Sequence, residues 1–306
     1  MKNKIAFLGV LIFFTFTSFA QSNLIAIQNE NNADGSVSIS ADNFAGCKYT
    51  VKLSFNSLSG FANTGGMNPY ITVINPGKTQ VTKLMPDQNA GYRSLNYNYS
   101  FYAGIYFRKA PTNYAHYLLP VTAGKTTLVT KVTALSNLMG QKQESFFYAQ
   151  GFSYALGDTI CATRAGYVYN INDQLKQGEG GNTVFTDGRN KIYIQHKDGT
   201  LGYYTILAPI NCLVQNGDYV IPGQPIAIFN KAAEKYTMLF STYYLDEEKI
   251  RSENPKEAYK ALPTNYYLNE NAPSTTLVEN QKYESVKSIP IIAEELSKRD
   301  KKKLGL

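Results

Sequence analysis

The sequence predicts an all-β protein, and three observations carry this prediction. The chain has 24 Tyr and 16 Phe among 306 residues, in stretches that alternate apolar and polar residues, a pattern typical of strands. Turn signals of Gly, Pro, Asp and Asn separate these stretches at short intervals. Hydrophobic residues make up 43% and charged residues 17% of the chain, which indicates a packed core and not disorder. The length favours about two domains.

Residues 1–20 have the features of a secretory signal peptide. Lys2 and Lys4 precede the apolar run 5–16, and the Ser-Phe-Ala triplet 18–20 suits a signal peptidase. We expect cleavage after position 20 and a periplasmic or secreted protein. No Cys follows the apolar run, so no lipoprotein anchor is expected, and no later segment is apolar and long enough to span a membrane.

Residues 21–130 are predicted to form a β-sandwich that serves as an accessory domain. The stretch YTVKLSF places Val51, Leu53 and Phe55 on one face of a strand. Further strands are expected in PYITVINPG, SLNYNYSFYAGIYF and YLLPVTAGKTTLVTKV, each near a turn signal. His116, ahead of an apolar run, is interpreted as a packing residue. Residues 131–147 are expected to be a linker or a short helix.

Residues 148–246 form a second predicted β domain with a weak internal repeat. LGDTICATRAGYVYNI and NGDYVIPGQPIAIFN each place a Gly-Asp turn before a β-branched strand and a second apolar strand, which predicts a duplicated β unit. Between the copies, IQHKDGTLGYYTIL predicts a hairpin around Asp198-Gly199. Asp158, Asp198 and Asp218 occupy Gly-adjacent turns, where Asp commonly bonds its own backbone.

Residues 247–306 are a C-terminal extension with a basic tail. A short helix is expected behind Pro290, with Ile292 and Leu296 on one face. The basic run 298–303 is interpreted as a solvated helix end, since cations suit a helix C-terminus, and no nucleic-acid partner is expected.

Three cysteines leave the thiol chemistry open. Cys47, Cys161 and Cys212 have no zinc-finger spacing. An exported protein can form disulfides, so a Cys161–Cys212 bridge and three free thiols are both compatible with the sequence.

Taken together, GDTICATRAGYV, NKIYIQHKDGTLGYYTIL and VQNGDYVIPGQPIAIF resemble the lysostaphin/LytM-type zinc peptidases, metallopeptidase family M23, with their duplicated hybrid motif. The resemblance covers about 100 residues and implies a LytM-like fold for the second domain. It also implies a zinc hydrolase, in which three protein ligands hold the metal and a bound water is activated. The family takes a His and an Asp from an HxxxD motif, a His from an HxH motif, and catalytic histidines from HxH and YxHL motifs.

This sequence departs from the family pattern at each of those positions. The YxHL match places Ile206 where the catalytic His is expected, and the HxH match places Thr237 and Leu239 where the two histidines are expected. The HxxxD match falls on Phe147 and Gly151. The resemblance therefore implies a degenerate member with no catalytic residue, no metal ligand and no cofactor. With zinc excluded, we expect Phe147, Tyr204, Ile206 and Leu239 to pack as one apolar cluster.

Two functions follow from the resemblance. The first is an exported, non-catalytic pseudoenzyme of the cell envelope that binds peptidoglycan or an envelope protein or peptide. Its candidate groove contains His196, beside the former site, and the tyrosines Tyr203, Tyr204, Tyr236 and Tyr243, whose rings suit binding. The alternative is an active zinc metalloendopeptidase that cleaves peptidoglycan cross-links. The net charge of +5 without Lys2 and Lys4 favours an anionic polymer.

Overall fold

The computed structural model describes residues 24–112, 115–131, 149–172, 190–206, 208–229, 236–252 and 258–306. These residues form strands with only short helices, so the predicted all-β fold class is confirmed. The expected signal peptide and all but the first residue of the expected linker lie outside the described residues. Within the described ranges, no helix combines the length and the apolar character that crossing a bilayer requires.

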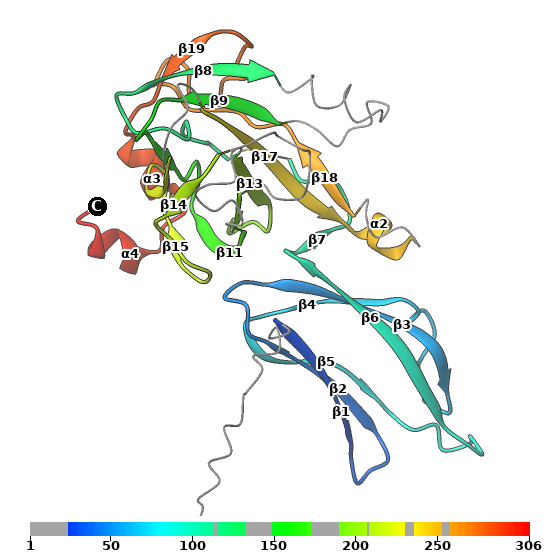
Figure 1. Ribbon diagram of the computed structural model, residues 1–306. Helices are drawn as coiled ribbons and strands as arrows, with labels where there is room; N and C mark the ends of the chain where they lie inside the picture. Colours follow the sequence, from blue (N-terminus) through cyan, green and yellow to red (C-terminus); the bar gives the residue numbers. More distant parts are fainter. Residues whose placement is uncertain are drawn as a thin grey trace, which may run out of the picture.

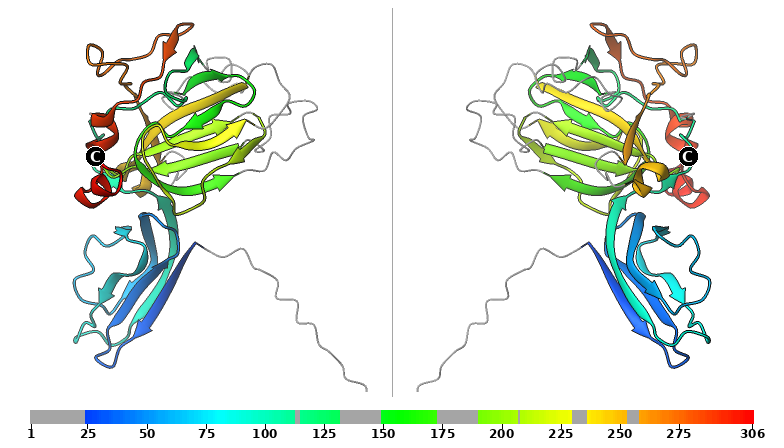
Figure 2. Two further views of the ribbon diagram at one scale, coloured as in Figure 1. Left: turned by 90° about the vertical axis from the view of Figure 1, so that its left-hand side faces the viewer. Right: turned by 90° about the vertical axis from the view of Figure 1, so that its right-hand side faces the viewer.

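The N-terminal unit is a sandwich of two three-stranded antiparallel sheets, coloured blue to cyan in Figure 2. The sheets have the strand orders β1-β2-β5 and β4-β3-β6. Alternate residues of β2 are buried, as expected for a strand with one face on a core. The strands are β1 (Ile25–Asn31), β2 (Val37–Asn43), β3 (Tyr49–Ser59), β4 (Tyr70–Ile74), β5 (Gly77–Leu84) and β6 (Ser94–Ala103).

The second unit packs a large sheet against a small one. The large sheet has the order β15-β11-β12-β13-β17-β9-β8-β19, with β18 and β7 also paired to β17, and the small sheet has the order β10-β16-β14. Figure 1 shows this unit above the N-terminal sandwich. Its strands are β7 (Tyr106–Phe107), β8 (Thr126–Lys131), β9 (Gln150–Tyr154), β10 (Thr159–Cys161), β11 (Gly166–Asn172), β12 (Asn190–Gln195), β13 (Leu201–Ile206), β14 (Ile210–Cys212), β15 (Tyr219–Val220), β16 (Pro225–Phe229), β17 (Tyr236–Asp246), β18 (Tyr259–Leu262) and β19 (Lys282–Glu284).

The unit boundaries differ from those expected from the sequence. Strand β7 pairs with β17, and β8 pairs with β9. The strands of the N-terminal sandwich therefore end at Ala103, before the expected boundary at residue 130, because Val129 of β8 packs in the core of the second unit. The extension after residue 246 also joins this unit, since β18 pairs with β17 and β19 with β8.

The internal repeat is present in the structure as two intertwined copies. In copy one β10 precedes β11, and in copy two β15 precedes β16. The pairing is reciprocal: β10 pairs with β16, and β11 pairs with β15. Each copy starts with the same turn, in which the Asp carboxylate accepts a hydrogen bond from the amide three residues earlier, Ala155 N to Asp158 and Gln215 N to Asp218, both at 2.8 Å.

The two units share an extensive interface. The side-chain amide of Gln195 at the end of β12 accepts from Lys48 N at 3.0 Å and donates to Lys48 O at 2.9 Å. The apolar core of the sandwich continues onto the large sheet, where Leu201 and Tyr169 belong to the same buried cluster. At Gly46 a Cβ atom would lie 2.8 Å from the Cα of Gly217, so only glycine allows this backbone contact.

Three short helices are described, and two of them end the chain. Helix α2 (Glu247–Arg251) follows β17, α3 (Ile289–Glu294) starts at Ser288 with Pro290 in its first turn, and α4 (Lys298–Lys303) is the basic tail. Leu118 packs with Ile291 and Ile292 of α3 and with Leu296, which follows the helix. Helix α4 buries no residue, as expected for a solvated helix end. The structure thus has two short helices here instead of one.

Candidate functional site

Strand register decides which of the expected site positions can face one another. In the sheet, Leu239 pairs with Thr205 on one side and with Gly151 on the other, whereas Ile206 pairs with Met238. Directly paired residues point to the same face, and successive residues of a strand point to opposite faces. Thr237, Leu239 and Gly151 therefore share one face, and Ile206 lies on the other.

The face of Ile206 is the core of the second unit. Ile206 and Tyr204 are fully buried there beside Met238, Phe240 and Phe152. The Tyr204 hydroxyl accepts from the amide of Thr163 at 2.7 Å and contacts its hydroxyl at 2.8 Å. The expected apolar cluster is thus present for Tyr204 and Ile206. It is wrong for Leu239, which faces away, and Phe147 lies outside the described residues.

The face of Leu239 does not fit the zinc site of the resembled family. A Cβ atom at Gly151, the expected position of the Asp ligand, would lie 2.3 Å from the hydroxyl oxygen of Thr130 on β8. A carboxylate side chain at this position would require the Thr130 hydroxyl to rotate away, and it would also crowd the Thr130 carbonyl, which lies 3.1 Å from the Cβ position. Leu239 itself is 7% exposed and apolar. The residues present therefore do not fit a zinc ion.

The two histidines of the chain are both described and lie in different places. His116 is half-buried, with its Nδ1 atom 3.1 Å from a carboxylate oxygen of Glu294. His196 is buried at the end of β12. Among the described residues, no group of three or more His, Cys, Asp or Glu side chains is arranged to hold a metal ion.

His196 has a packing position and an unpaired nitrogen. Its Nδ1 atom donates to the carbonyl of Ala165 at 2.8 Å, which leaves Nε2 as an acceptor without a hydrogen-bond partner in the described chain. A Cβ atom at Gly202 would lie 2.9 Å from Nε2, so glycine makes room for the ring. Burial, followed by the charge of Arg164, lowers the pKa of His196 to about 3. The imidazole is neutral at physiological pH.

Arg164 is a buried charge with a full set of partners. Its guanidinium binds Glu295 bidentately, with Nε to Oε2 at 2.9 Å and Nη2 to Oε1 at 2.5 Å. It also donates to Asp198 at 2.9 Å, and to the hydroxyls of Tyr117 and Thr200 at 3.2 Å each. Burial alone would lower the pKa of Arg164, but the bonds and charges of these carboxylates raise it on balance. The network anchors the C-terminal tail to the hairpin that carries His196.

An interdomain cavity of about 570 Å³ lies beside this network, within the range of ligand pockets. Its walls come from the N-terminal sandwich, from the edge of the large sheet and from the C-terminal tail. Tyr167 and Tyr219 pair across β11 and β15, with ring centroids 4.9 Å apart. The lining residues are Gly46, Cys47, Lys48, Pro76, Ile105, Gly166, Tyr167, Gln195, His196, Lys197, Tyr219, Glu295, Ser297 and Asp300.

The structure does not form the expected tyrosine groove. Tyr204 is in the core. Tyr203 and Tyr243 pack against the N-terminal sandwich, and the centroids of their two rings are 4.7 Å apart. The side chain of Tyr236 lies outside the described residues. Of the four candidate groove residues whose side chains are described, only His196 lines the interdomain cavity. Alternation sends the adjacent Tyr203 and Tyr204 to opposite faces, so they cannot line one groove together.

Cys161 and Cys212 are thiols in the structure. Strands β10 and β14 lie on opposite sides of β16, so these two residues are separated by two strand spacings, about 9.5 Å. A disulfide requires Cα atoms within about 7 Å. The Cys161–Cys212 bridge, one of the two alternatives left by the sequence, is therefore excluded by this topology.

Sequence reasoning missed Arg164, Glu295, Tyr167 and Tyr219. One signal was available for Arg164: a single charge stands among small residues in CATRAG, and a buried Arg requires a partner. Its partner Glu295 lies 131 residues away, a pairing that no local pattern indicates.

Comparisons with known proteins add little to this geometry. No family model matches the chain, and no curated protein matches it. The solved structure of Csd3 from Helicobacter pylori is similar over 91% of this chain and 82% of that chain, with 11% sequence identity and a TM-score of 0.29. A likeness at this level carries no argument about family or function.

Proposed function

We propose that the protein is an exported, non-catalytic relative of the M23 peptidases that binds peptidoglycan or a peptide of the cell envelope. The observation that carries the proposal is the loss of a usable metal site on the face of Leu239. A carboxylate at Gly151 would collide with the Thr130 hydroxyl as it stands, and neither Gly151 nor Leu239 offers a side-chain donor atom. Ile206 lies on the opposite face, so a His there would not complete the site.

The binding site of this proposal is the interdomain cavity, whose lining carries both signs of charge. Lys48 and Lys197 supply ammonium groups and Asp300 supplies a carboxylate, whereas the carboxylate of Glu295 is already paired with Arg164. Tyr167 adds a ring that is 46% exposed, and rings of this kind suit contacts with the apolar parts of a ligand. Such a lining is complementary to a short peptide that carries both ammonium and carboxylate groups, as the stem peptides of peptidoglycan do.

Co-sedimentation with purified sacculi tests the proposed binding. The wild type should pellet with sacculi at low salt, and Tyr167→Ala should pellet several-fold less. The matched control is Tyr92→Ala, which removes an exposed tyrosine of the N-terminal unit that does not line the cavity. A wild type that stays in the supernatant, or equal pelleting of the two variants, would contradict the proposal.

Elemental analysis tests the non-catalytic part of the proposal. Purified protein that has been exposed to zinc and then dialysed into zinc-free buffer should retain far less than one zinc per chain, since a catalytic zinc needs three protein ligands. Digestion of sacculi should release no peptides. Retention of about one zinc per chain, with hydrolysis that a chelator abolishes, would restore the alternative of an active endopeptidase.

A further inference from the structure

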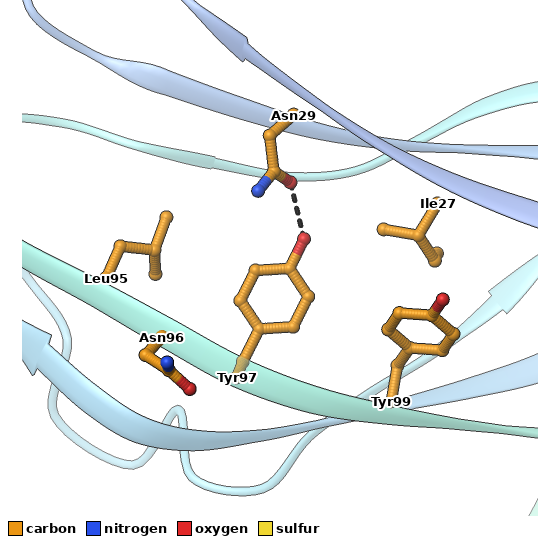
Figure 3. Close-up of a pocket in the computed structure, with 6 residues that line it drawn as sticks. All are labelled: Ile27, Asn29, Leu95, Asn96, Tyr97 and Tyr99. Carbon is orange, nitrogen blue, oxygen red and sulfur yellow. Dashed lines mark hydrogen bonds between the residues drawn. The ribbon is translucent and has the colours of Figure 1, made fainter.

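A second cleft runs along the open edge of the N-terminal sandwich, between β1 and β6. These strands are the edge strands of the two sheets. The cleft has two adjoining parts, of about 380 Å³ and 480 Å³, which share Asn29 and Leu95. We call it the sandwich cleft. Figure 3 shows the first part, with side chains from both strands directed into the space between them.

The lining of the sandwich cleft follows from strand alternation. Asn29 and Asn31 come from one face of β1, and Leu95, Tyr97 and Tyr99 come from one face of β6. Leu95 and Tyr97 also pack on the sandwich core, so the floor is apolar. The β1 wall therefore carries the amides of Asn29 and Asn31 beside Ile27, and the β6 wall carries the rings of Tyr97 and Tyr99 beside Asn96.

Two side chains cross the cleft and connect the sheets. The hydroxyl of Tyr97 donates to Oδ1 of Asn29 (Figure 3). Arg93 donates from Nη1 to the carbonyl of Gly35 at 2.5 Å, between the start of β6 and the turn after β1. An added peptide strand would have to displace these bridges to pair with either edge. The bridges therefore favour a ligand that lies over them and uses side-chain groups.

The available groups point to a neutral ligand rich in hydroxyl groups. Arg93 is the only charged residue of the lining. Asn29 and Asn31 are exposed and line the cleft, and the Tyr97 hydroxyl bonds to the carboxamide oxygen of Asn29, not to its nitrogen. Tyr99 is 52% exposed and offers a ring face. Amides satisfy hydroxyl groups, and aromatic rings cover the apolar CH face of a pyranose.

We propose that the sandwich cleft binds a linear, neutral glycan chain. Its volume suits one or a few sugar rings, and its open ends along β1 and β6 allow a chain to continue in both directions. The inference rests on the proposed function for its biological setting, an envelope polymer. It assigns the glycan part of that polymer to a different unit from the interdomain cavity.

Isothermal titration with chitotetraose and with cellotetraose tests the sandwich cleft on the full mature chain. We expect saturable binding of at least one tetrasaccharide, and a loss of affinity of about tenfold or more in Asn31→Ala/Tyr99→Ala. The matched control is Tyr92→Ala/Asn98→Ala. Asn98 lies on the opposite face of β6, and neither control residue lines the cleft. Equal melting temperatures of both double variants establish that each is folded.

The outcomes separate this inference from the proposed function. Absence of binding to both tetrasaccharides, or equal loss in the cleft and control variants, overturns the glycan site. Pelleting with sacculi that depends on Tyr167 would then still support the interdomain cavity. Conversely, tetrasaccharide binding that depends on Asn31 and Tyr99, without pelleting of the wild type, supports the cleft and contradicts the envelope function.

Discussion

The two copies of the internal repeat begin alike and end differently. Both start with a Gly in the left-handed region, with φ of 78° at Gly157 and 92° at Gly217, followed by an Asp that closes the turn. Seven residues after the Gly, copy one has Arg164 and copy two has Gln224. Arg164 reaches Glu295 and Asp198 across the fold. The side chain of Gln224 accepts from the amide of Ile221 at 3.1 Å, within its own turn.

This difference separates local from long-range contributions to the fold. The turn needs only its own residues, so both copies keep it. A charged residue seven positions after the Gly needs partners from two other segments, and only in copy one do such partners lie within contact distance. The specialised part of the molecule, beside the interdomain cavity and the C-terminal tail, is therefore built on copy one. Copy two supplies mainly Tyr219 to the same region.

At neutral pH the largest expected effect is on Arg164. Arg164→Ala should lower the free energy of unfolding by about 3 kcal/mol, because it leaves Glu295, whose side chain is 17% exposed, without its cation. The matched change Gln224→Ala should cost about 0.5–1 kcal/mol, the value of one partly exposed hydrogen bond. Urea denaturation measures both. Equal losses would show that the two copies contribute alike.

The next effect is a pH dependence that belongs to copy one, through the contact of His196 with Ala165. The pKa of His196 is about 3 in the folded chain and about 6.5 when unfolded. Between these values the unfolded chain binds a proton that the folded chain does not. This contribution to stability is therefore complete above pH 6.5, and it falls as the pH drops towards 3, by at most about 1.4 kcal/mol per unit.

Denaturation at several pH values, with His196→Gln as the comparison, measures this effect. The variant should show a shallower loss of stability between pH 6.5 and pH 4. In the wild type, the ring signal of His196 in NMR spectra should not titrate between pH 5 and pH 8. A titration midpoint near 6.5 would mean that the ring reaches water.

The smallest effect concerns the shared turn. Asp158→Ala and Asp218→Ala should each cost about 1 kcal/mol, because each leaves one turn amide without its acceptor. The ion pair of Asp158 with Lys125 is largely exposed and should add little. Thermal melts of the two variants test the equivalence of the turns. A difference of more than about 1 kcal/mol between the two stability losses would show that the turns are not equivalent.

The sequence was sufficient for the local parts of the structure. Alternation identified strands such as β3, the Gly-Asp echo predicted the duplication, and Asp198-Gly199 marked its hairpin. Alternation also argues against the expected tyrosine groove, since Tyr203 and Tyr204 are adjacent in one strand and therefore point to opposite faces. The groove could have been rejected from the sequence alone.

Strand register and long-range pairing could not be predicted from the sequence in this way. A motif match fixes positions along the chain, but a shift of one residue in pairing reverses the face of a side chain. Ile206 and Leu239 were therefore expected together and lie apart. The pairing of Arg164 with Glu295 and the sandwich cleft between β1 and β6 both depend on segments brought together only by the complete fold.

The reciprocal pairing of the copies has a consequence for the order of folding. The strand pairings of the N-terminal sandwich can all form once β6 has been synthesised, because they lie within residues 25–103, whereas Tyr169 and Leu201 join its core later. In contrast, β10 waits for β16, and β8 receives its outer neighbour only when Lys282–Glu284 is available. Such non-local contacts slow folding and leave edges exposed in the meantime. A growing chain therefore carries a first unit with all its strands paired and a second unit that stays incomplete until residues 282–284 appear.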